Sequence, residues 1–479
     1  MTKISSPASK RREPQRPALS AEIFLIPLDE NKFIVYAPLR QSAFIGNDYV
    51  ADYIRRLQDG RWSATRRDGP LVELLRGLDM VDAAPESPPH RAFGPDPKPT
   101  SVTLFLTTAC NLRCSYCYAS AGLSRPRYMS LSTARRGIDF AARNAASTPC
   151  RSLGVTYHGG GEPTAHWNLL LESARHAQVR ARVMDLSLTI TLTTNGVLSQ
   201  EQRDWVRANV TSLTISCDGL PSVHDECRKD LKGRPSSGQV FETLAYLDRA
   251  GCKYGIRATV TATAFRSLPD SVDLLTSQFR PEGVQVEPVY LLGRASEAAS
   301  AESEEFVKAF RLARDRAVAN GRRIWFSGAR LGTLTNHFCS ATQDNFCLSA
   351  DGNVSSCYEA FSEDAPHAQL FYYGRPAEEG QGYEFDHTAL ERLRSQAVES
   401  RAFCRNCFAK WTCGGDCYYK WRAASLSPEF DGSPRCEIIR ELTKDQILEK
   451  IAEAGGAFWR ETRGHAQGGS HDGGGVPGL

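Results

Sequence analysis

Three cysteines near residue 110 have the residue type and spacing to hold a metal cluster. Cys110, Cys114 and Cys117 follow one another at intervals of four and three residues. Iron-sulfur clusters are held by cysteine thiolates and normally take four of them. Three thiolates leave one iron open, and a metal site short of one protein ligand can bind a reactant. A zinc loop is the alternative, but it needs a fourth ligand nearby, and the next histidine downstream, His158, is remote.

Eight further cysteines gather in the C-terminal third of the chain. Their densest part reads Cys404, two residues, Cys407, five residues, Cys413, three residues, Cys417. Eight thiols divide into two clusters of four, and a treble-clef zinc module over 404–417 is the alternative. The other four members of this group are Cys339, Cys347, Cys357 and Cys436. Of the 15 cysteines, four stand alone, and we interpret them as small buried hydrophobic side chains: Cys150, Cys217, Cys227 and Cys252.

A repeating pattern of strands and helices must position the first three cysteines. Residues 101–106 alternate β-branched, aromatic and aliphatic side chains, which predicts a strand that ends just before Cys110. Five more strand patterns follow, separated by amphipathic helical patterns, and this alternation predicts an α/β fold with a partial parallel (β/α) barrel. The strands are expected at 153–157, 186–192, 213–216, 254–260 and 284–288, and the helices at 130–145, 166–183, 199–208, 238–250 and 268–278.

Polar turns follow the second, third and fourth of these strands. The sequences are Gly159-Gly160-Gly161-Glu162-Pro163, Thr194-Asn195-Gly196 and Ser216-Cys217-Asp218-Gly219. Glycine lets the backbone approach a ligand closely, and a carboxylate accepts hydrogen bonds from an ammonium group. Each turn alone is a common signal. Their order at successive strand ends predicts one site at the C-terminal edge of the barrel.

The CxxxCxxC motif, with Tyr116 before its last cysteine, resembles the signature of the radical S-adenosylmethionine (SAM) enzymes. In that family the amino and carboxylate groups of SAM chelate the open iron. The resemblance implies that the glycine-rich turn contacts the SAM amino group and that Ser216 and Asp218 lie near its ribose and carboxylate. The residues it implies for binding SAM are Gly160, Gly161, Glu162, Thr194, Asn195, Ser216, Asp218, Arg228 and Arg257.

Two of these assignments have a structural alternative. The segment with His224, Asp225 and Arg228 lines the SAM and substrate side in relatives, but it could equally be a surface loop. Arg257 lies on the fifth predicted strand, where it would pair with the SAM carboxylate or else face outward.

The C-terminal cysteine pattern resembles the SPASM extension of radical SAM peptide and protein maturases. The resemblance implies three 4Fe-4S clusters, one that binds SAM and two auxiliary ones, and a flavodoxin- or ferredoxin-type electron donor. If Cys347 is instead a core thiol, the first auxiliary cluster has an open iron that can bind substrate. The implied ligands are Cys339, Cys347, Cys357 and Cys417 for the first auxiliary cluster and Cys404, Cys407, Cys413 and Cys436 for the second.

Composition restricts the class of protein. The chain has 479 residues, 41% hydrophobic and 24% charged, with a formal net charge of +3, which is ordinary for a soluble globular protein. The small charge gives no indication of nucleic acid as a partner, and no apolar run approaches the roughly 20 residues of a membrane span. The bunched cysteines suit clusters in a reducing compartment, so we expect a cytoplasmic protein.

The remaining segments frame the barrel. Residues 20–83 read as three short strands and two helices, a pattern that resembles the winged-helix leader-recognition domain of peptide-modifying enzymes. Its third strand would take up a leader peptide by strand addition, and an extension that only packs on the catalytic domain is the alternative. The other expected regions are a disordered tail at 1–19, a linker at 84–99, the barrel at 100–300, a bridging helix at 301–338, the SPASM domain at 339–440, and a helix with a flexible tail at 441–479.

The resemblance implies a peptide-modifying enzyme. Such enzymes cleave SAM to a 5'-deoxyadenosyl radical and abstract hydrogen from a peptide, and we expect a thioether or carbon crosslink in a ribosomally synthesised peptide. A sulfatase-type maturase that forms formylglycine is one alternative, but its catalytic Asp is here replaced by Tyr358, followed by Glu359 as the candidate base. The other alternative is a non-catalytic electron-transfer protein with several clusters.

Overall fold

The computed structural model divides into two compact units. Among the residues that the structure describes, one unit lies within 16–89 and 443–461, and the other lies within 90–442. The structure describes residues 16–29, 31–61, 68–290, 292–295, 302–425, 427 and 429–461. Within these ranges, no helix has the length and hydrophobicity needed to cross a bilayer.

A parallel sheet forms the centre of the larger unit. All six predicted strands are present and lie side by side in chain order, because each is followed by a helix that returns the chain to the same edge. They are β4 (Ser101–Leu104), β5 (Ser152–Tyr157), β6 (Ser187–Thr194), β7 (Ser212–Ser216), β8 (Gly255–Val260) and β9 (Val284–Pro288), and β10 (Ile324–Trp325) adds beyond β9. The order runs from β10 to β14 without closing, so the predicted α/β fold with a partial barrel is confirmed.

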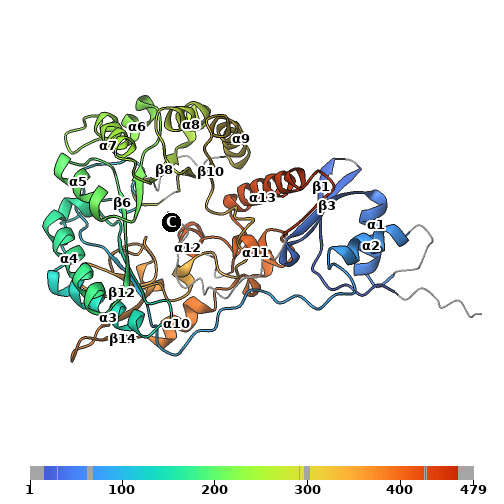
Figure 1. The fold of residues 1–479 in the computed structure, drawn as a ribbon, viewed down its shortest axis with the longest axis horizontal. Coiled ribbons are helices and arrows are strands. Elements are labelled where there is room, and N and C mark those ends of the chain that lie inside the picture. Colours follow the sequence, from blue (N-terminus) through green and yellow to red (C-terminus); the bar gives the residue numbers. More distant parts are fainter. Residues whose placement is uncertain are drawn as a thin grey trace, which may run out of the picture. The chain divides into compact units, whose positions relative to one another are not determined.

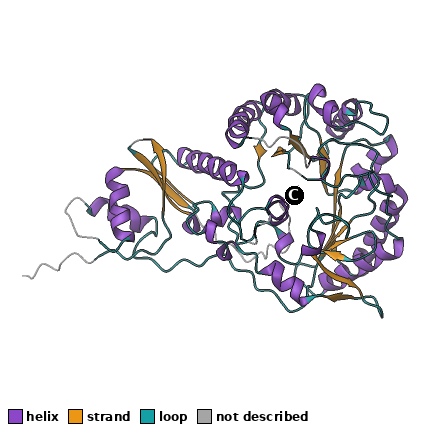
Figure 2. Ribbon diagram, turned by 180° about the vertical axis from the view of Figure 1, so that it is seen from behind, coloured by secondary structure: helices purple, strands orange, loops and turns teal. Residues whose placement is uncertain are grey.

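Helices cover the outer side of this curved sheet, and the strands line its inner side (Figures 1 and 2). On β5 the helix-facing side chains of Leu153, Val155 and Tyr157 are fully buried, as the alternating pattern predicts. The helices are α3 (Leu131–Ala146), α4 (Trp167–Val183), α5 (Gln200–Asn209), α6 (Pro221–Cys227), α7 (Ser237–Arg249), α8 (Leu268–Ser277) and α9 (Ser303–Ala319). The bridging helix predicted at 301–338 is therefore α9 followed by a non-helical segment that contains β10.

The cysteine-rich region extends the same sheet on its other side. Strand β11 (Cys347–Leu348) pairs in parallel with β4, with Cys347 opposite Thr103. Then β12 (Val354–Ser355), β13 (Tyr372–Pro376) and β14 (Tyr383–Phe385) continue antiparallel. The sequence analysis missed this extension because two-residue strands are too short to show periodicity.

Short helices complete the cysteine-rich region. They are α10 (His387–Arg394), α11 (Lys410–Cys413), α12 (Tyr418–Ala424) and the first part of α13 (Pro434–Glu453). The C-terminal helix predicted from residue 441 thus begins at Pro434, since proline is well suited to the first turn of a helix. This earlier start places Cys436 inside the first turn of α13.

The smaller unit is an antiparallel sheet with two helices. Its elements are β1 (Phe24–Asp29), β2 (Lys32–Ala37), β3 (Ser42–Asn47), α1 (Asp48–Gln58), α2 (Gly69–Gly77) and β15 (Phe458–Arg460). The Asn47 side chain accepts a hydrogen bond from Val50 N at 3.2 Å and so caps α1. Tyr53 and Ile54 of α1 pack with Val35 of β2 in a fully buried core.

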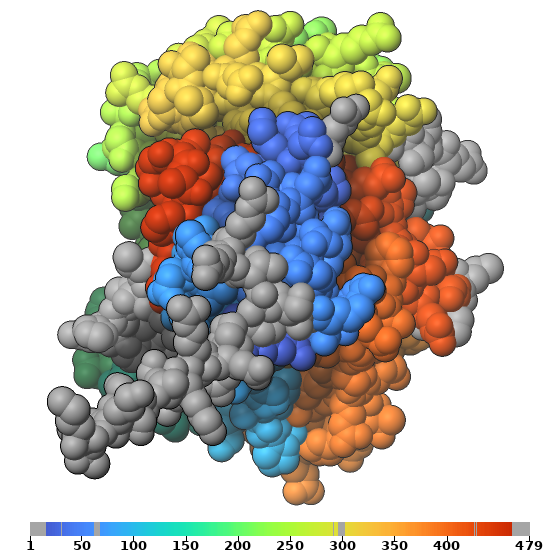
Figure 3. Space-filling model, turned by 90° about the vertical axis from the view of Figure 1, so that its right-hand side faces the viewer, coloured from blue at the N-terminus to red at the C-terminus, as the bar shows by residue number. Residues whose placement is uncertain are grey.

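The third strand, which the sequence analysis expects to accept a leader peptide by strand addition, has only part of its edge free. Strand β15 pairs with β3, with Phe458 opposite Phe44 and Arg460 opposite Ser42, so the sheet order is β1-β2-β3-β15. The C-terminal residues of this unit, in red, adjoin its N-terminal residues, in blue (Figure 3). A peptide that adds to β3 must therefore displace β15 or use the part of β3 beyond Phe44.

Three smaller expectations meet the structure as follows. Leu19 forms a β-bridge with Val81, so the described end of the predicted disordered tail is held in place, while residues 1–15 lie outside the described ranges. The predicted flexible tail after residue 461 also lies outside them. Cys150 is exposed rather than buried, whereas Cys217 and Cys227 are buried as expected.

Candidate active site

The loop with the first three cysteines is held against the segment that follows α6. Arg113 N donates to Lys229 O at 2.7 Å, and Ser115 N donates to Cys227 O at 2.9 Å. Arg294 secures the other side of the loop, because its side chain donates to Cys114 O and its N–H donates to Cys117 O. The backbone of the loop is thus fixed by the protein before any cofactor binds.

The three thiols face one another closely enough to interact. Burial raises the pKa of Cys110 to about 12, and Glu162 and the thiols of Cys114 and Cys117 contribute to this rise. Such thiols are protonated at neutral pH, so a cluster that binds them must displace their protons. Among the described residues no three His, Cys, Asp or Glu side chains converge tightly enough to hold a single metal ion.

A glycine-rich turn lies against this loop. A side chain at residue 161 would collide with the carbonyl oxygen of Ala109, and Glu162 N donates to that same oxygen at 2.9 Å. Gly160 has a φ of +93°, and a Cβ there would lie 2.8 Å from the ring of Phe361. Only glycine allows this approach, so the backbone after β5 can reach a ligand bound at the cysteine loop.

Glu162 joins the glycine-rich turn to the next one. Its buried carboxylate accepts hydrogen bonds from Thr194 Oγ1 at 2.7 Å, Asn195 N at 2.8 Å and Thr164 Oγ1 at 2.8 Å. The family resemblance assigns this carboxylate to the SAM amino group, but both of its oxygens already have donors within the protein. The Asn195 side chain continues toward the cluster loop, where its Nδ2 donates to Asn111 Oδ1 at 2.6 Å and lies 3.9 Å from Cys110 Sγ.

Asp218 and Arg228 form a buried ion pair beneath the cysteine motif. Arg228 Nε lies 2.9 Å from Asp218 Oδ2, and the pair is 4–6% exposed. Asp218 also accepts hydrogen bonds from Tyr116 OH and from Thr259 N, the latter at 3.0 Å. Burial alone would raise the pKa of Asp218, but Arg228 holds it below its usual value. The pair therefore supports the aromatic residue of the motif.

The surface-loop alternative for this segment is wrong. His224 is fully buried, its Nδ1 accepts from Asp218 N at 3.3 Å, and its Nε2 lies 3.1 Å from Ser236 Oγ. Burial lowers the pKa of His224 to about 4. The ring is therefore neutral at physiological pH and acts as a structural link.

Arg257 faces the interior of the barrel, so the outward-facing alternative is wrong. It lies on β8 opposite Ser216 of β7, and its charge is close enough to help lower the pKa of buried His158 and of Glu287. Among the described residues its guanidinium has no hydrogen bond or ion pair. Arg257 is thus a cation at the C-terminal edge of the sheet that is available to an anionic ligand.

Several buried polar groups line the same interior. The rings of His158 and Tyr358 stack at 4.4 Å, and within the described part of the chain His158 Nδ1, Tyr118 OH and Glu359 Oε2 have no hydrogen-bond partner. Glu359 Oε1 lies 3.9 Å from Lys420 Nζ. Burial raises the pKa of Tyr358 far above its usual value, so Tyr358 is a poor base.

The structure brings seven of the eight C-terminal cysteines together in two groups. Burial, Glu359 and Cys417 raise the pKa of Cys357, and Cys339 lies near both of these cysteines. Burial raises the pKa of Cys404 to about 12, and nearby Cys407 and Cys436 contribute to this rise. Burial and the charge of Asp416 raise the pKa of Cys413, and nearby Cys436 raises it further. Cys417 thus lies with Cys339 and Cys357 although Cys413 is its neighbour in sequence.

Cys347 stands somewhat apart from its predicted partners. It is fully buried on β11, and its Sγ accepts a hydrogen bond from Asn345 Nδ2 at 3.1 Å. Burial raises its pKa, a nearby Thr103 hydroxyl lowers it, and Cys339 is the cysteine that acts on it. Whether Cys347 is a ligand or a core thiol stays an open prediction.

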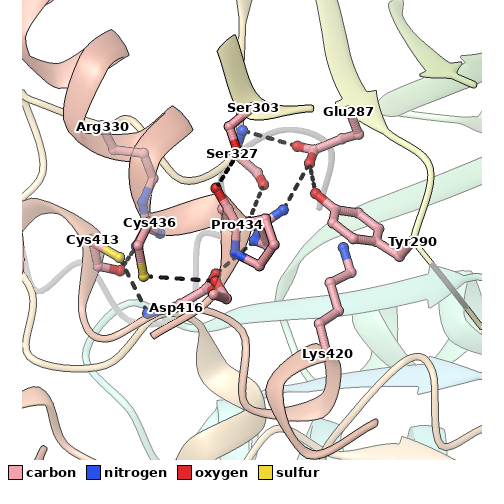
Figure 4. Close-up of polar contacts among 12 residues, drawn as sticks. Glu287, Tyr290, Ser303, Ser327, Arg330, Cys413, Asp416, Lys420, Pro434 and Cys436 are labelled. Carbon is pink, nitrogen blue, oxygen red and sulfur yellow. Dashed lines mark hydrogen bonds and ion pairs between the residues drawn. The ribbon is translucent and has the colours of Figure 1, made fainter. Parts of the chain in front are cut away.

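A buried network ties the cysteine-rich region to the barrel wall. Asp416, which lies between Cys413 and Cys417, pairs with Arg435 at 2.7 Å, and Arg435 lies 3.4 Å from Glu287 of β9. Asp416 N donates to Cys413 Sγ at 3.2 Å. Figure 4 shows Asp416 beside Cys413 and Cys436, with Glu287 and its hydrogen-bond donor Tyr290 across the network.

The composition of both regions fits iron-sulfur clusters. The donors are thiols, glycines clear the approach to the first group, and unpartnered N–H groups of Arg330 and Arg401 lie around the second. Thiolates are the usual ligands of such clusters. The individual ligand assignments stay predictions.

A comparison with protein families matches residues 104–271 to the radical SAM superfamily. These residues form a radical SAM domain. The expected resemblance to radical SAM enzymes is confirmed, and a domain of this kind implies SAM and one 4Fe-4S cluster. The matched residues run from the end of β4 into α8, so they include the cysteine loop and the three turns described above.

Curated relatives of this radical SAM chain include two maturation proteins. The sporulation killing factor maturation protein SkfB of Bacillus subtilis is 26% identical over 54% of this chain and 60% of its own length. The serine-type anaerobic sulfatase-maturating enzyme of Bacteroides thetaiotaomicron is 29% identical over 35% of this chain and 41% of its own. The chain thus spans less than two thirds of either relative.

Solved structures share the fold. The chain resembles anSMEcpe with bound AdoMet, with a TM-score of 0.59 and 16% identity over 74% of this chain and 99% of that one. It also resembles Streptococcus suis SuiB bound to precursor peptide SuiA, with a TM-score of 0.51 and 13% identity over 87% of this chain and 99% of that one. Both likenesses concern the fold.

Proposed function

We propose that this radical SAM enzyme is a peptide maturase that abstracts hydrogen from a peptide substrate and installs a thioether or carbon crosslink. The observation that carries the proposal is the cysteine loop after β4, packed against a glycine-rich turn, with eight further cysteines gathered on the β11 side of the same sheet. When bound, the cluster and SAM supply reductive cleavage to a 5'-deoxyadenosyl radical.

The residues of the chain bind and orient the cofactor. Cys110, Cys114 and Cys117 would hold the cluster, and the backbone at Gly160 and Gly161 would approach the SAM amino group. The Arg257 guanidinium would pair with the SAM carboxylate, since among the described residues it faces the barrel interior without a partner and a guanidinium matches a carboxylate geometrically. Ser216 is its neighbour on β7 and would lie near the ribose.

The remaining residues predicted to bind SAM act by holding other residues in place. Glu162 holds Thr194 and Asn195 in place through its hydrogen bonds. Asp218 and Arg228 support Tyr116. We assign these five residues to positioning the cluster loop and the turns that bind SAM.

The peptide substrate is supported by fold and by relatives. The likeness to SuiB bound to a precursor peptide extends over 87% of this chain, and SkfB is named as a maturation protein. We assign the smaller unit to recognition of a leader, the two groups of cysteines to two auxiliary 4Fe-4S clusters, and electron supply to a flavodoxin- or ferredoxin-type donor.

A sulfatase-type maturase is the second candidate, favoured by the relative of that name. Tyr358 weighs against it, because this residue stacks on His158 and its pKa is raised by burial. A phenol in that state does not accept a proton at neutral pH. Glu359, with one carboxylate oxygen buried and unpartnered among the described residues, is the remaining candidate base.

Anaerobic reconstitution tests the proposal. The purified chain should contain about twelve irons and, after reduction, should convert SAM to 5'-deoxyadenosine. Addition of a peptide encoded next to the gene should yield a product that lacks two hydrogens per crosslink. A chain that holds its clusters but gives no 5'-deoxyadenosine would instead be an electron-transfer protein.

A further inference from the structure

Three of the arginines that lie near the eight C-terminal cysteines differ in how their charge is balanced. Arg435 is 5% exposed and has two carboxylate partners, Asp416 at 2.7 Å and Glu287 at 3.4 Å. Its charge is therefore balanced within the protein. Arg330 and Arg401 have no such partner among the described residues.

Arg330 lies between the two groups of cysteines. Its guanidinium donates to Cys413 O at 2.7 Å and lies 5.0 Å from the centre of the Phe338 ring, while its Nε is buried and has no partner within the described ranges. Burial lowers the pKa of Arg330, and the sulfur groups of Cys413 and Cys339 oppose this effect. Figure 4 shows Arg330 beside Cys413 and Cys436. The side chain thus faces one cysteine from each group.

Arg401 faces one group. It is 5% exposed, and its Nε and NH1 are buried without a hydrogen-bond partner in the described residues. The guanidinium lies 5.1 Å from the Trp421 ring and 5.0 Å from the Phe430 ring. The backbone of Gly415, whose φ is +90°, packs closely against this guanidinium, since a Cβ at that position would lie 3.2 Å from it. Its charge acts on Cys404 of the second group and, beyond ion-pair distance, on Asp416, the carboxylate that pairs with Arg435.

A guanidinium with buried, unpartnered N–H groups and no carboxylate in ion-pair range is unfavourable. Iron-sulfur clusters would supply the anion that these residues of the protein do not, since a four-iron cluster with four thiolates carries net negative charge. The donors that lack partners also lie beside the thiols that would hold such clusters. The two arginines are therefore better explained as partners of the clusters than as side chains that only pack within the fold.

We propose that Arg330 and Arg401 are the counter-ions of the two auxiliary clusters and raise their reduction potentials, Arg330 acting on both and Arg401 on the cluster at Cys404. The proposal rests on the part of the proposed function that assigns two auxiliary clusters. Reduction adds one electron, and so one negative charge, to a cluster without making or breaking a bond. A fixed positive charge nearby favours the reduced form, so its loss makes the potential more negative.

The test uses the full-length chain with Cys114→Ala, which removes the SAM-binding cluster and leaves the auxiliary signals alone. Arg330→Gln and Arg401→Gln are titrated with dithionite under EPR detection, and iron is counted in each. We expect Arg330→Gln to shift both couples to more negative potential and Arg401→Gln to shift one. Arg392→Gln is the matched control, because Arg392 is an exposed residue whose side chain donates to the carbonyls of residues 369 and 370. It should shift neither.

Lysine variants separate charge from shape. Arg330→Lys and Arg401→Lys keep the charge and should retain potentials close to those of the parent. If a glutamine variant does not load auxiliary iron while its lysine counterpart does, the counter-ion role is supported. Unchanged potentials in fully loaded glutamine variants would overturn the proposal, as would failure of both variants to load.

Failure of the counter-ion role is distinguishable from failure of the auxiliary clusters. A parent chain with about four irons instead of about twelve contradicts the auxiliary clusters themselves. A parent chain with all its iron but with potentials insensitive to Arg330 and Arg401 contradicts only the counter-ion role. Formation of 5'-deoxyadenosine by the chain with Cys114 intact is measured in a separate assay, and its result decides neither the presence of the auxiliary clusters nor the counter-ion role.

Discussion

The two cysteine-rich regions of this chain balance their buried charges differently. Around the loop of Cys110, Cys114 and Cys117, Asp218 pairs with Arg228, and Glu162 is saturated by protein donors. Around the eight C-terminal cysteines, Arg330 and Arg401 lack anionic partners among the described residues. Among the described residues, the buried pair of Asp218 and Arg228 balances its charges within the first region, where Arg257 is left to an anionic ligand, whereas the second region leaves two guanidinium groups without a carboxylate in ion-pair range.

The difference has a physical consequence for how each region is held. A loop whose supporting ion pair is closed within the protein keeps its geometry whether or not the cofactor is present, which suits a site that must exchange SAM at every turnover. A region whose buried cations need cluster anions is stable only when loaded. SAM would thus be the exchangeable part of the first region, and the auxiliary clusters would be permanent parts of the second.

The largest effect that sharpens this comparison is expected from Cys114→Ala. Removal of one of three ligands should abolish 5'-deoxyadenosine formation and remove about four of about twelve irons, while the auxiliary clusters remain. The measurement is iron content together with SAM cleavage under reducing conditions. Cys150→Ala, at an exposed cysteine outside both regions, should change neither quantity. Loss of all iron in Cys114→Ala would mean that the regions are not independent.

Asp218→Asn removes the carboxylate that balances the charge of Arg228 in the first region. It leaves Arg228 buried without a carboxylate, and removal of one partner of a buried pair typically costs about 3–5 kcal/mol. We expect the midpoint of denaturant unfolding to fall accordingly, with weakened SAM cleavage. The double variant Asp218→Asn, Arg228→Met removes both charges and should recover part of the stability. Equal destabilisation in single and double variants would argue against the ion pair.

Glu359→Gln tests the proton acceptor proposed at the boundary between the regions. The side chain keeps its shape but loses its basicity, so if Glu359 is the base, formation of the modified peptide should fall about 100-fold, while cleavage of SAM continues. The measurement is the ratio of modified peptide to 5'-deoxyadenosine by mass spectrometry. A ratio equal to that of the unmodified enzyme would remove Glu359 from the chemistry.

The smallest expected effect concerns pH and the support of the first region. His224 has a pKa of about 4 in the folded protein and about 6.5 when unfolded, so the unfolded chain binds more protons between these values. The contribution of His224 to the free energy of unfolding is complete above pH 6.5 and is lost as pH falls toward 4. The loss amounts to about 2 kcal/mol by pH 5. His224→Gln should therefore show a flatter dependence of unfolding free energy on pH between 7 and 5. An unchanged slope would exclude His224 as its source.

Much of the catalytic unit could be predicted because its signals are local. The strand before Cys110, the five later strands and the turns at their ends follow from periodicity and turn residues within short windows. The role of Glu162 could not be predicted in this way, since its donors Thr194 and Asn195 lie on another strand end. Buried His158 and the unpartnered Arg330 likewise carry no sequence signal of their function, because it depends on which groups surround them in the described structure.

By itself the sequence determined the parallel order of β4 to β9 and the chemistry of the cysteine loop, since right-handed strand-helix-strand connections leave few alternatives. Only the tertiary structure decided that β11 joins β4 and that β15 covers part of β3. These pairings join residues far apart in the chain through strands of two or three residues. Such contacts are set by the packing of the whole unit, and no local pattern encodes them.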